Sequence, residues 1–220
     1  MKNSHLPLAY QRGYQHFYKQ TLHVIPGVFI PRSDTESLVV WSVHHIPARS
    51  RVLELGIGTG AICIALACDR PDLMIQGVEK DLLSYGIARR NIRLYDVSID
   101  VRLGDWFSNI DQRYDVIISN PPYVGNFDAV GSCTIFEPRA ALFSGLDGYE
   151  DLQHIILNSV HHLNLSGMLI LEHGSTQGDR VGHMMRDAGY GDITKIYDLS
   201  GHHRGTAGII KDRHLTGHTC

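Results

Sequence analysis

Arg51-Val-Leu-Glu-Leu-Gly56-Ile-Gly58-Thr-Gly60-Ala-Ile-Cys-Ile-Ala-Leu66 is the stretch of sequence that decides the fold. A short apolar strand runs into glycines at alternate positions, and an apolar segment with helical spacing follows. Glycine has no Cβ, so the backbone can turn sharply there and a ligand can approach it closely. The stretch therefore predicts a strand, a glycine-rich turn and the start of a helix, the first βα unit of a parallel sheet.

Strands and helices alternate along the rest of the chain. We expect further strands at 73–79, 99–103, 114–119, 167–172, 192–197 and 206–210, and helices at 60–69, 82–93, 149–163 and 176–188. Parallel strands that alternate with helices of this length form a doubly wound α/β sheet, which binds ligands at the carboxyl ends of its strands. One such domain is expected over residues 31–210.

The segments that flank this pattern have their own signals. Residues 1–30 are expected to hold a β-hairpin in the run Phe17 to Ile25, with Pro26-Gly27 as its turn. Ser33 or Asp34 is expected to cap a helix that runs to Trp41, because Ser33 and Glu36 have capping-box spacing. Residues 211–220 are expected to be a loose tail. The aperiodic stretch 124–148 is longer than a loop that only connects two elements of a compact domain.

Composition excludes several classes of protein. The chain has 220 residues, a formal net charge of −3 and a pI near 6.5, so stable nucleic-acid binding is not expected. No segment has the length and apolarity of a membrane span or a signal peptide, which favours a cytoplasmic protein. The cysteines show no metal-binding or disulfide spacing, and Cys63 and Cys68 are interpreted as small core residues. The 14 histidines form no zinc motif, so no metal site is expected.

Acidic and aromatic residues follow successive strands where each strand ends. Glu54 precedes the glycines, and its carboxylate could form an ion pair with a cationic ligand. Glu79 ends the second strand, where a carboxylate can accept hydrogen bonds from two ribose hydroxyls. Asp105-Trp106 follows the third strand and could bind an adenine, although a Trp-Phe pair can equally pack in a core. Together these positions suit S-adenosylmethionine (AdoMet). The expected cofactor-binding residues are Glu54, Gly56, Ile57, Gly58, Thr59, Gly60, Glu79, Lys80, Asp105, Trp106 and Asn120.

Asn120-Pro121-Pro122-Tyr123 closes the apolar run that starts at Tyr114. A carboxamide and a rigid, carbonyl-rich turn stand there beside an aromatic ring. This combination can accept the hydrogens of a flat NH2 group while the ring stacks on its plane, so that the nitrogen lone pair stays free to attack an electrophilic carbon. The alternative is a plain turn, in which Asn-Pro starts a loop that Pro-Pro stiffens.

The chain resembles the glutamine side-chain methyltransferases of peptide-chain release factors, the HemK/PrmC type. The matching segments occur in order over most of residues 10–210: Phe29-Ile-Pro-Arg-Ser-Asp-Thr-Glu36, Glu54-Leu-Gly-Ile-Gly-Thr-Gly60, Gly104-Asp-Trp-Phe107, Ser119-Asn-Pro-Pro-Tyr123, Phe136-Glu-Pro-Arg139 with Ala141-Leu142, and Leu171-Glu-His-Gly174. The N-P-P-Y segment is shared with adenine methyltransferases. The I-P-R-x-D-T-E and F-E-P-R segments make the match specific.

The resemblance implies the class I, Rossmann-like methyltransferase fold, a seven-stranded sheet with its last strand antiparallel, preceded here by the hairpin. It implies transfer of a methyl group from AdoMet, with S-adenosylhomocysteine as product, to the glutamine of the release factor's G-G-Q tripeptide. Asn120, Pro121 and Tyr123 would be catalytic. Substrate binding would involve Asn120, Pro121, Pro122, Tyr123, Arg32 and Glu137.

Two departures from the family and several alternatives stay open at this stage. Family members usually begin with a helical domain that grips the release factor, so we expect this chain, a monomer, to have a raised KM for it. Ile57 stands where many relatives have a small polar residue. The target could instead be a ribosomal-protein glutamine or an adenine in nucleic acid, or the chain could be a non-catalytic, AdoMet-binding partner subunit. The G-x-G-x-G spacing disfavours a nicotinamide-dependent oxidoreductase.

Overall fold

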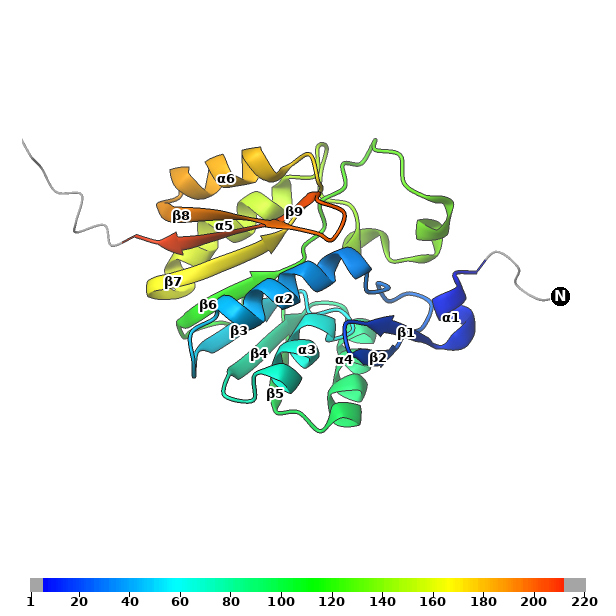
Figure 1. Cartoon of the computed structure of the whole chain (residues 1–220). Helices are drawn as coiled ribbons and strands as arrows, with labels where there is room; N and C mark the ends of the chain where they lie inside the picture. The colour runs from blue at the N-terminus through cyan, green and yellow to red at the C-terminus, as the bar shows by residue number, and fades with distance from the viewer. Residues whose placement is uncertain (1–5, 212–220) are drawn as a thin grey trace, which may run out of the picture.

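The computed structural model describes residues 6–211, apart from the side chains of residues 132 and 133 (Figure 1). Its main sheet has seven strands in the order β5-β4-β3-β6-β7-β9-β8. Their bounds are β3 (Arg51–Leu55), β4 (Met74–Glu79), β5 (Ile99–Leu103), β6 (Tyr114–Ser119), β7 (Leu163–Glu172), β8 (Tyr190–Tyr197) and β9 (His203–Ile210). The last strand, β9, is antiparallel to both β7 and β8, while the other pairs are parallel. This confirms the expected fold class.

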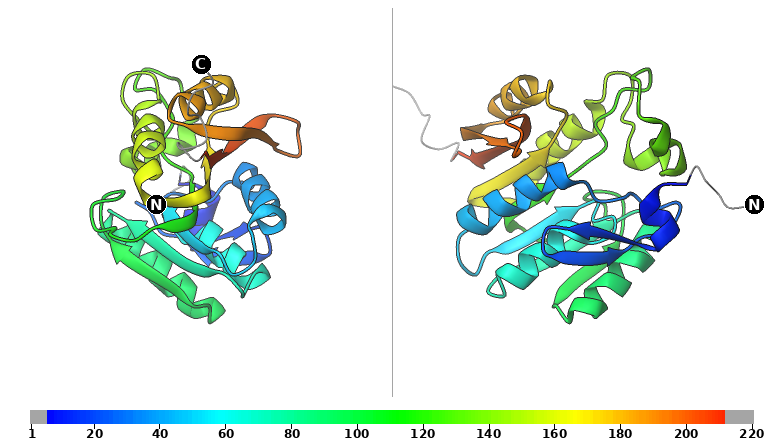
Figure 2. Two further views of the ribbon diagram at one scale, coloured as in Figure 1. Left: turned by 90° about the vertical axis from the view of Figure 1, so that its left-hand side faces the viewer. Right: turned by 45° about the vertical axis from the view of Figure 1, so that its right-hand side comes forward.

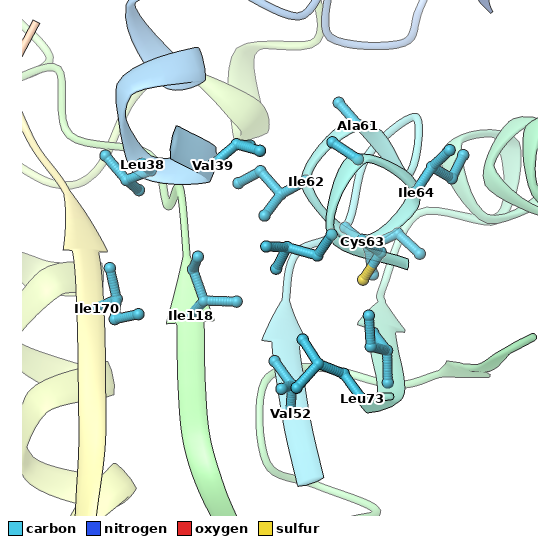
Figure 3. Packing of buried hydrophobic residues seen from close by; sticks show 14 of the residues in the cluster. Leu38, Val39, Val52, Ala61, Ile62, Cys63, Ile64, Leu73, Ile118 and Ile170 are labelled. Carbon is cyan, nitrogen blue, oxygen red and sulfur yellow. The ribbon is translucent and has the colours of Figure 1, made fainter. Parts of the chain in front are cut away.

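Helices cover both faces of the sheet. The helices α2 (Glu36–His45), α3 (Ala61–Asp69) and α4 (Leu82–Tyr95) pack on one face, and α5 (Glu150–His162) and α6 (Gly178–Asp187) on the other. Successive residues of a strand point to opposite faces: Val52 and Ile118 join the core under α2 and α3, whereas Leu53 joins the core under α5. Figure 3 shows Ile118 and Ile170 side by side beneath Leu38 of α2. Burial on both faces explains why these strands read as continuous apolar runs.

The sheet order reverses between β3 and β6. From β3 the chain proceeds outward to β4 and β5, and then returns to pair β6 on the other side of β3. In doubly wound sheets the crevice at such a point, outside the carboxyl ends of the strands, binds ligands. Gly56 and Asn120 are the residues that directly follow these two central strands.

The N-terminal hairpin differs from the expectation. It consists of β1 (Tyr14–Phe17) and β2 (Gln20–His23), so its turn is Tyr18-Lys19, and Pro26-Gly27 forms a separate turn after it. The alternating burial of Phe17 and Leu22 fixes this register, and Tyr18 accepts a φ of +53° while its hydroxyl donates to Asp69 at 2.8 Å. The tertiary contacts of the strands outweigh the local Pro-Gly signal. A short helix, α1 (Leu8–Arg12), precedes the hairpin and was not predicted.

Three further expectations are wrong in detail. Ser33 to Thr35 form a 3₁₀ turn before α2, with no side-chain cap, so the predicted capping box does not occur. The helix also continues past Trp41 to His45. The rings of these two residues stack with their centroids 4.1 Å apart. Cys68 is exposed and is not a core residue, whereas Cys63 is buried as expected. The expected tail lies outside the described residues from position 212 onward.

The hairpin lies beside α4 (Figure 2). Asn91 of α4 ties the hairpin to the glycine-rich turn. Its buried side chain accepts from the His23 N–H at 2.8 Å and donates to the His23 carbonyl at 3.1 Å. The same amide also donates to the Thr59 carbonyl at 2.9 Å. One side chain therefore holds both the edge of the hairpin and the turn that follows β3.

The loop after Tyr123 folds back on itself. Val124 forms an isolated parallel bridge with Phe143, and the segment between them contains the 3₁₀ turns η2 (Ser132–Phe136) and η3 (Arg139–Ala141). The stretch 124–148 is therefore an ordered excursion over the carboxyl edge of the sheet, as its length indicated.

We predict that Gly77→Ala lowers the free energy of unfolding by about 1–3 kcal/mol, because overpacking a core strains its neighbours. A Cβ at Gly77 in β4 would lie 2.7 Å from the Ile57 Cγ2 atom. Urea denaturation followed by circular dichroism measures the loss. Adding Ile57→Ala should recover part of it.

Gly86→Ala is the matched control for this substitution. Gly86 is exposed in the middle of α4, with no atom within 4 Å of the new Cβ, so alanine should raise stability by about 0.5–1 kcal/mol there. Equal stability of the wild type and Gly77→Ala would refute the packing argument.

Candidate active site

A cleft with about 770 Å³ of empty space opens at the carboxyl edge of the sheet, over the ends of β3, β4, β5 and β6. Of the residues that the sequence singles out, Gly56, Gly58, Glu79, Lys80, Asp105, Trp106, Asn120 and Pro122 line it. The remaining lining residues are Phe29, Val78, Asp81, Ser84, Gly104, Pro138, Ala140 and Ala141. The structure thus gathers residues from four strand ends and from the 124–148 loop around one cavity.

The glycine-rich turn forms one wall of this cleft. Gly56, Gly58 and Gly60 all have positive φ values, 68°, 56° and 84°, which glycine adopts without strain. A Cβ at Gly56 would lie 3.5 Å from the Trp106 ring, so the missing side chain keeps the wall open. Gly60 lies behind the turn, where a Cβ would meet Ile64, and lines neither this cleft nor the recess beyond it.

Glu79 is the buried acid of the cleft. Its Oε2 accepts from the Gly58 N–H at 2.8 Å and its Oε1 from the Asp81 N–H at 2.9 Å, so the carboxylate is held in one orientation. Burial raises its pKa, and these backbone N–H groups lower it in part. Each carboxylate oxygen has two lone pairs, which leaves one on each for a ligand hydroxyl.

Lys80, Asp105 and Trp106 form the opposite, more exposed wall. The Lys80 Nζ lies 3.8 Å from Asp105 Oδ1 and 5.5 Å from the centre of the Trp106 ring. Trp106 lines the cleft and also packs against the core under α5. The Trp106 side chain therefore packs in the core and also forms part of the cleft wall. The two sequence interpretations do not exclude each other.

Glu54 faces a second recess on the other side of the glycine-rich turn, which Ile57, Thr59 and Phe17 also line. The carboxylate is buried, and its Oε2 accepts from the Cys63 N–H at 2.8 Å. Burial, and to a smaller extent the neighbouring Glu79, raise the pKa of Glu54 to about 8, while its contacts with Cys63 lower it in part. Among the described residues no cationic side chain contacts this carboxylate, so a positively charged ligand would stabilise its ionised form.

Asn120 stands where the compartments meet. It lines the cleft, the Glu54 recess and a third recess, and Phe29 does the same. The Asn120 Nδ2 donates to the Thr35 hydroxyl at 3.1 Å. Because its NH2 group is used in this way, the side-chain oxygen of Asn120 is left as the acceptor for a ligand.

The third recess is lined by Pro121 and Tyr123 together with Arg32 and residues of the 124–148 loop. The Tyr123 hydroxyl donates to Glu172 Oε1 at 3.2 Å. Burial, with the adjacent Glu172 carboxylate, raises the pKa of Tyr123 well above its usual range. The ring therefore stays neutral and fixed beside Asn120.

Glu137 joins two distant segments. It forms an ion pair with Arg32 Nη2 and accepts from the Ile30 N–H at 3.0 Å. Its side chain is 1% exposed, so both oxygens are held within the protein, whereas the Arg32 side chain is 36% exposed and reaches the third recess. Glu137 thus orients Arg32 and the segment that carries Phe29.

Sequence reasoning missed four residues of this arrangement: Phe29, Thr35, Glu172 and Asn91. Phe29 and Thr35 lie within the segment Phe29 to Glu36, and Glu172 within Leu171 to Gly174. Each of those segments was recognised as a whole through the family resemblance. No spacing or composition within a segment identified these individual side chains.

The described residues contain neither a group of three His, Cys, Asp or Glu side chains that could hold a metal ion nor a helix able to cross a membrane.

Comparison with known proteins identifies the family. Residues 19–142 match the methyltransferase small domain family. The release factor glutamine methyltransferase of Salmonella typhimurium is 39% identical over 208 residues, which cover 92% of this chain and 75% of that protein. The chain belongs to the release factor glutamine methyltransferase family.

Solved structures confirm the fold of this family in the chain. A methyltransferase from Pyrococcus furiosus superposes with a TM-score of 0.68 at 17% identity, covering 87% of this chain and 89% of that one. A T. thermophilus 16S rRNA methyltransferase in complex with AdoMet and guanosine gives a TM-score of 0.63 at 18% identity, covering 91% and 50%. Both likenesses concern the class I methyltransferase fold alone.

We predict that the Glu54 carboxyl group contributes a fall in the free energy of unfolding as the pH rises from 5 to 8, and that Glu54→Gln removes this contribution. The folded-state pKa of Glu54 is about 8, against an ordinary value of 4.5, so the folded protein binds more protons than the unfolded chain between these values. Glutamine keeps an acceptor for Cys63 without the charge. The variant should exceed the wild type by about 1–3 kcal/mol at pH 8 and less at pH 5.

Urea denaturation at both pH values checks this result. Asp100→Asn, which neutralises an exposed carboxylate, should leave the pH dependence unchanged. Parallel stability curves for the wild type and Glu54→Gln would contradict the assignment of a raised pKa to Glu54.

Proposed function

We propose that this chain transfers a methyl group from AdoMet to the side-chain amide of the glutamine in the G-G-Q tripeptide of a peptide-chain release factor. The observation that carries the proposal is the position of Asn120, whose free amide oxygen lies where the cleft, the Glu54 recess and the Tyr123 recess meet. An acceptor at that junction can hold an NH2 group against a methyl donor. Membership in the release factor glutamine methyltransferase family supports the same substrate.

The residues of the cleft fit AdoMet. Glu79 would accept the ribose hydroxyls, Asp105 and Trp106 would bind the adenine edge and face, and Lys80 would hold Asp105 in place. The positive-φ turn at Gly56 and Gly58 leaves room for close backbone approach. The remaining cofactor residues face the other side of the turn: Glu54, Ile57 and Thr59, with Gly60 behind them. When bound, AdoMet would supply an electrophilic methyl group on a sulfonium.

The reaction needs the amide nitrogen of glutamine to act as a nucleophile. That nitrogen is weak because its lone pair is delocalised into the carbonyl group. Hydrogen bonds from its NH2 to the Asn120 oxygen and the Pro121 carbonyl would favour a pyramidal nitrogen and aim the lone pair. The amide nitrogen would then take the methyl group that bound AdoMet supplies, with the electron pair of the broken bond left on sulfur, and the cationic amide would lose a proton to water.

The other residues of the N-P-P-Y segment would hold the amide in place. Pro122 fixes the turn that presents the Pro121 carbonyl, and the Tyr123 ring would flank the amide plane. Arg32, oriented by Glu137, would meet the peptide at the exposed side of the recess. Positioning and fixed dipoles then supply most of the rate enhancement.

Mass spectrometry of a release factor incubated with this protein and AdoMet tests the proposal. We expect the gain of one methyl group on the G-G-Q peptide and none on a release factor in which that glutamine is alanine. Ribosomal proteins and total RNA, incubated in parallel, test the other substrates. Methylation of either of them and not of the release factor would overturn the proposal.

Asn120→Ala should reduce kcat and kcat/KM together by about 10²–10³-fold and leave AdoMet affinity within a factor of a few. The contact it removes strengthens as the nitrogen gains positive charge, so the loss belongs to the transition state. Steady-state kinetics and isothermal titration with AdoMet measure the two quantities. A change confined to KM would show that Asn120 only binds substrate.

Glu79→Ala should show the opposite pattern, with AdoMet affinity lowered by about 10–100-fold and the KM for the release factor nearly unchanged. The substitution removes a charge-assisted acceptor for the ligand and also frees the Gly58 N–H. Isothermal titration with AdoMet decides the matter. If the variant bound AdoMet with wild-type affinity, Glu79 would not be a cofactor-binding residue.

A further inference from the structure

Glu172 is a buried carboxylate at the end of β7, the strand next to β6. The register pairs Ser119 of β6 with Leu171 of β7, so Asn120 and Glu172 leave neighbouring strands at the same level. Glu172 is 1% exposed, and its Oε1 accepts from the Tyr123 hydroxyl. Among the described residues, its Oε2 has no hydrogen-bond partner within normal geometry. No contact within the sheet explains why a charge is buried there.

Thr35 lies beside both Asn120 and this carboxylate. The Thr35 hydroxyl accepts from Asn120 Nδ2 at 3.1 Å, and a hydroxyl that accepts one hydrogen bond still has its own proton to donate. Thr35 is 3% exposed and lines the Glu54 recess. Its hydroxyl lies close enough to Glu172 to lower the pKa of the carboxyl group, although among the described residues no hydrogen bond of normal geometry reaches Oε2. The unpartnered Glu172 Oε2 is thus a nearby acceptor to which the Thr35 hydroxyl could turn its proton.

We propose that Glu172 is a positioning residue for the methyl transfer, because it orients Asn120 through Thr35 and Tyr123 directly. The inference rests on the proposed function, in which these two side chains bind the substrate amide. The Tyr123 hydroxyl already donates to Oε1, so Oε2 is the oxygen left for Thr35, and an ionised carboxylate supplies both acceptors. Its negative charge also polarises the Thr35 hydroxyl and through it the Asn120 amide, which makes the Asn120 oxygen a stronger acceptor.

The surroundings of Glu172 make its charge costly. Burial raises its pKa to about 7, the Thr35 and Tyr123 hydroxyls lower it in part, Asp34 raises it and Arg204 lowers it. Arg204 is itself paired with Asp34 at 2.9 Å and with Asp198 at 3.2 Å, so it does not form an ion pair with Glu172. A buried acid held mainly by hydroxyls costs stability, which is typical of a side chain kept for function.

Glu172→Gln is the decisive variant, because glutamine has the same shape but only one acceptor oxygen for two hydroxyl donors. We expect kcat for release-factor methylation to fall about 10–100-fold, while AdoMet affinity stays within twofold. The melting temperature at pH 8 should stay constant or rise, since the variant no longer buries a charge. Asp179→Asn, which removes a charge from an 80% exposed side chain, should match the wild type in all three measurements.

The pH profile separates positioning from mere structure. The wild-type kcat should rise as the pH passes through about 7, where the Glu172 carboxyl group ionises, and this inflection should be absent in Glu172→Gln. The charged and titratable groups that face Glu172 are Tyr123, whose pKa burial raises well above its usual range, and Arg204 and Asp34, which form an ion pair with each other. The same inflection in both proteins would contradict the proposal.

A double-mutant cycle with Thr35→Val tests the connection to Asn120. Valine removes the hydroxyl and keeps the shape, so it should lower kcat about as much as Glu172→Gln does. If Thr35 and Glu172 act as one unit, the double variant should lose little more than the worse single variant. Multiplying effects would show that the two residues act independently and would overturn the connection.

The wild-type protein distinguishes the two proposals. If it methylates the G-G-Q glutamine and Glu172→Gln does so with wild-type kcat, the inference fails and the proposed function stands. If the wild type itself does not methylate release factors, the proposed function fails and the inference falls with it. Loss of AdoMet affinity in Glu172→Gln would assign the residue to the cofactor cleft instead and would equally overturn the inference.

Discussion

The parallel pairing of β3 with β6 is the constraint on which the rest of the site depends. Both strands are buried on two faces, and their register sets Leu55 beside Ser119. The Ser119 hydroxyl donates to the Leu55 carbonyl at 2.8 Å and fixes the level at which both strands end. Gly56 and Asn120 therefore emerge side by side. A slip of one residue would exchange the two faces of β6 and move Asn120 away from the glycine-rich turn.

Three buried carboxylates lie near the carboxyl edge of the sheet. Burial raises the pKa of Glu54, Glu79 and Glu172, and within the described residues none of the three has a cationic partner in hydrogen-bond contact. Backbone N–H groups hold the first two, and the Tyr123 hydroxyl holds the third. When no ligand is bound, such carboxyl groups destabilise the protein at a pH above their ordinary pKa. A ligand that carries a sulfonium and an ammonium group would offset part of that cost.

The recess lined by Arg32, Asn120 and Tyr123 is assembled from segments that are far apart in the chain. Glu137 reaches across 105 residues to Arg32, and Asn120 reaches across 85 residues to Thr35. The excursion 124–148 and the approach to α2 thus meet over the end of β6. The contacts give a physical reason for the presence of both segments in this chain: each segment holds a side chain that the other needs.

The sequence by itself determined the α/β architecture, the glycine-rich turn and the acids at the strand ends, because those features depend on local periodicity and on where each strand stops. Its Pro26-Gly27 signal misplaced the hairpin turn, since the packing of Phe17 and Leu22 decides that register. Only the tertiary structure decided which side chains become partners. Nothing in the sequence singles out Thr35 and Glu172 as individual residues, and their contacts with Asn120 and Tyr123 follow from the pairing of strands that are far apart in the chain.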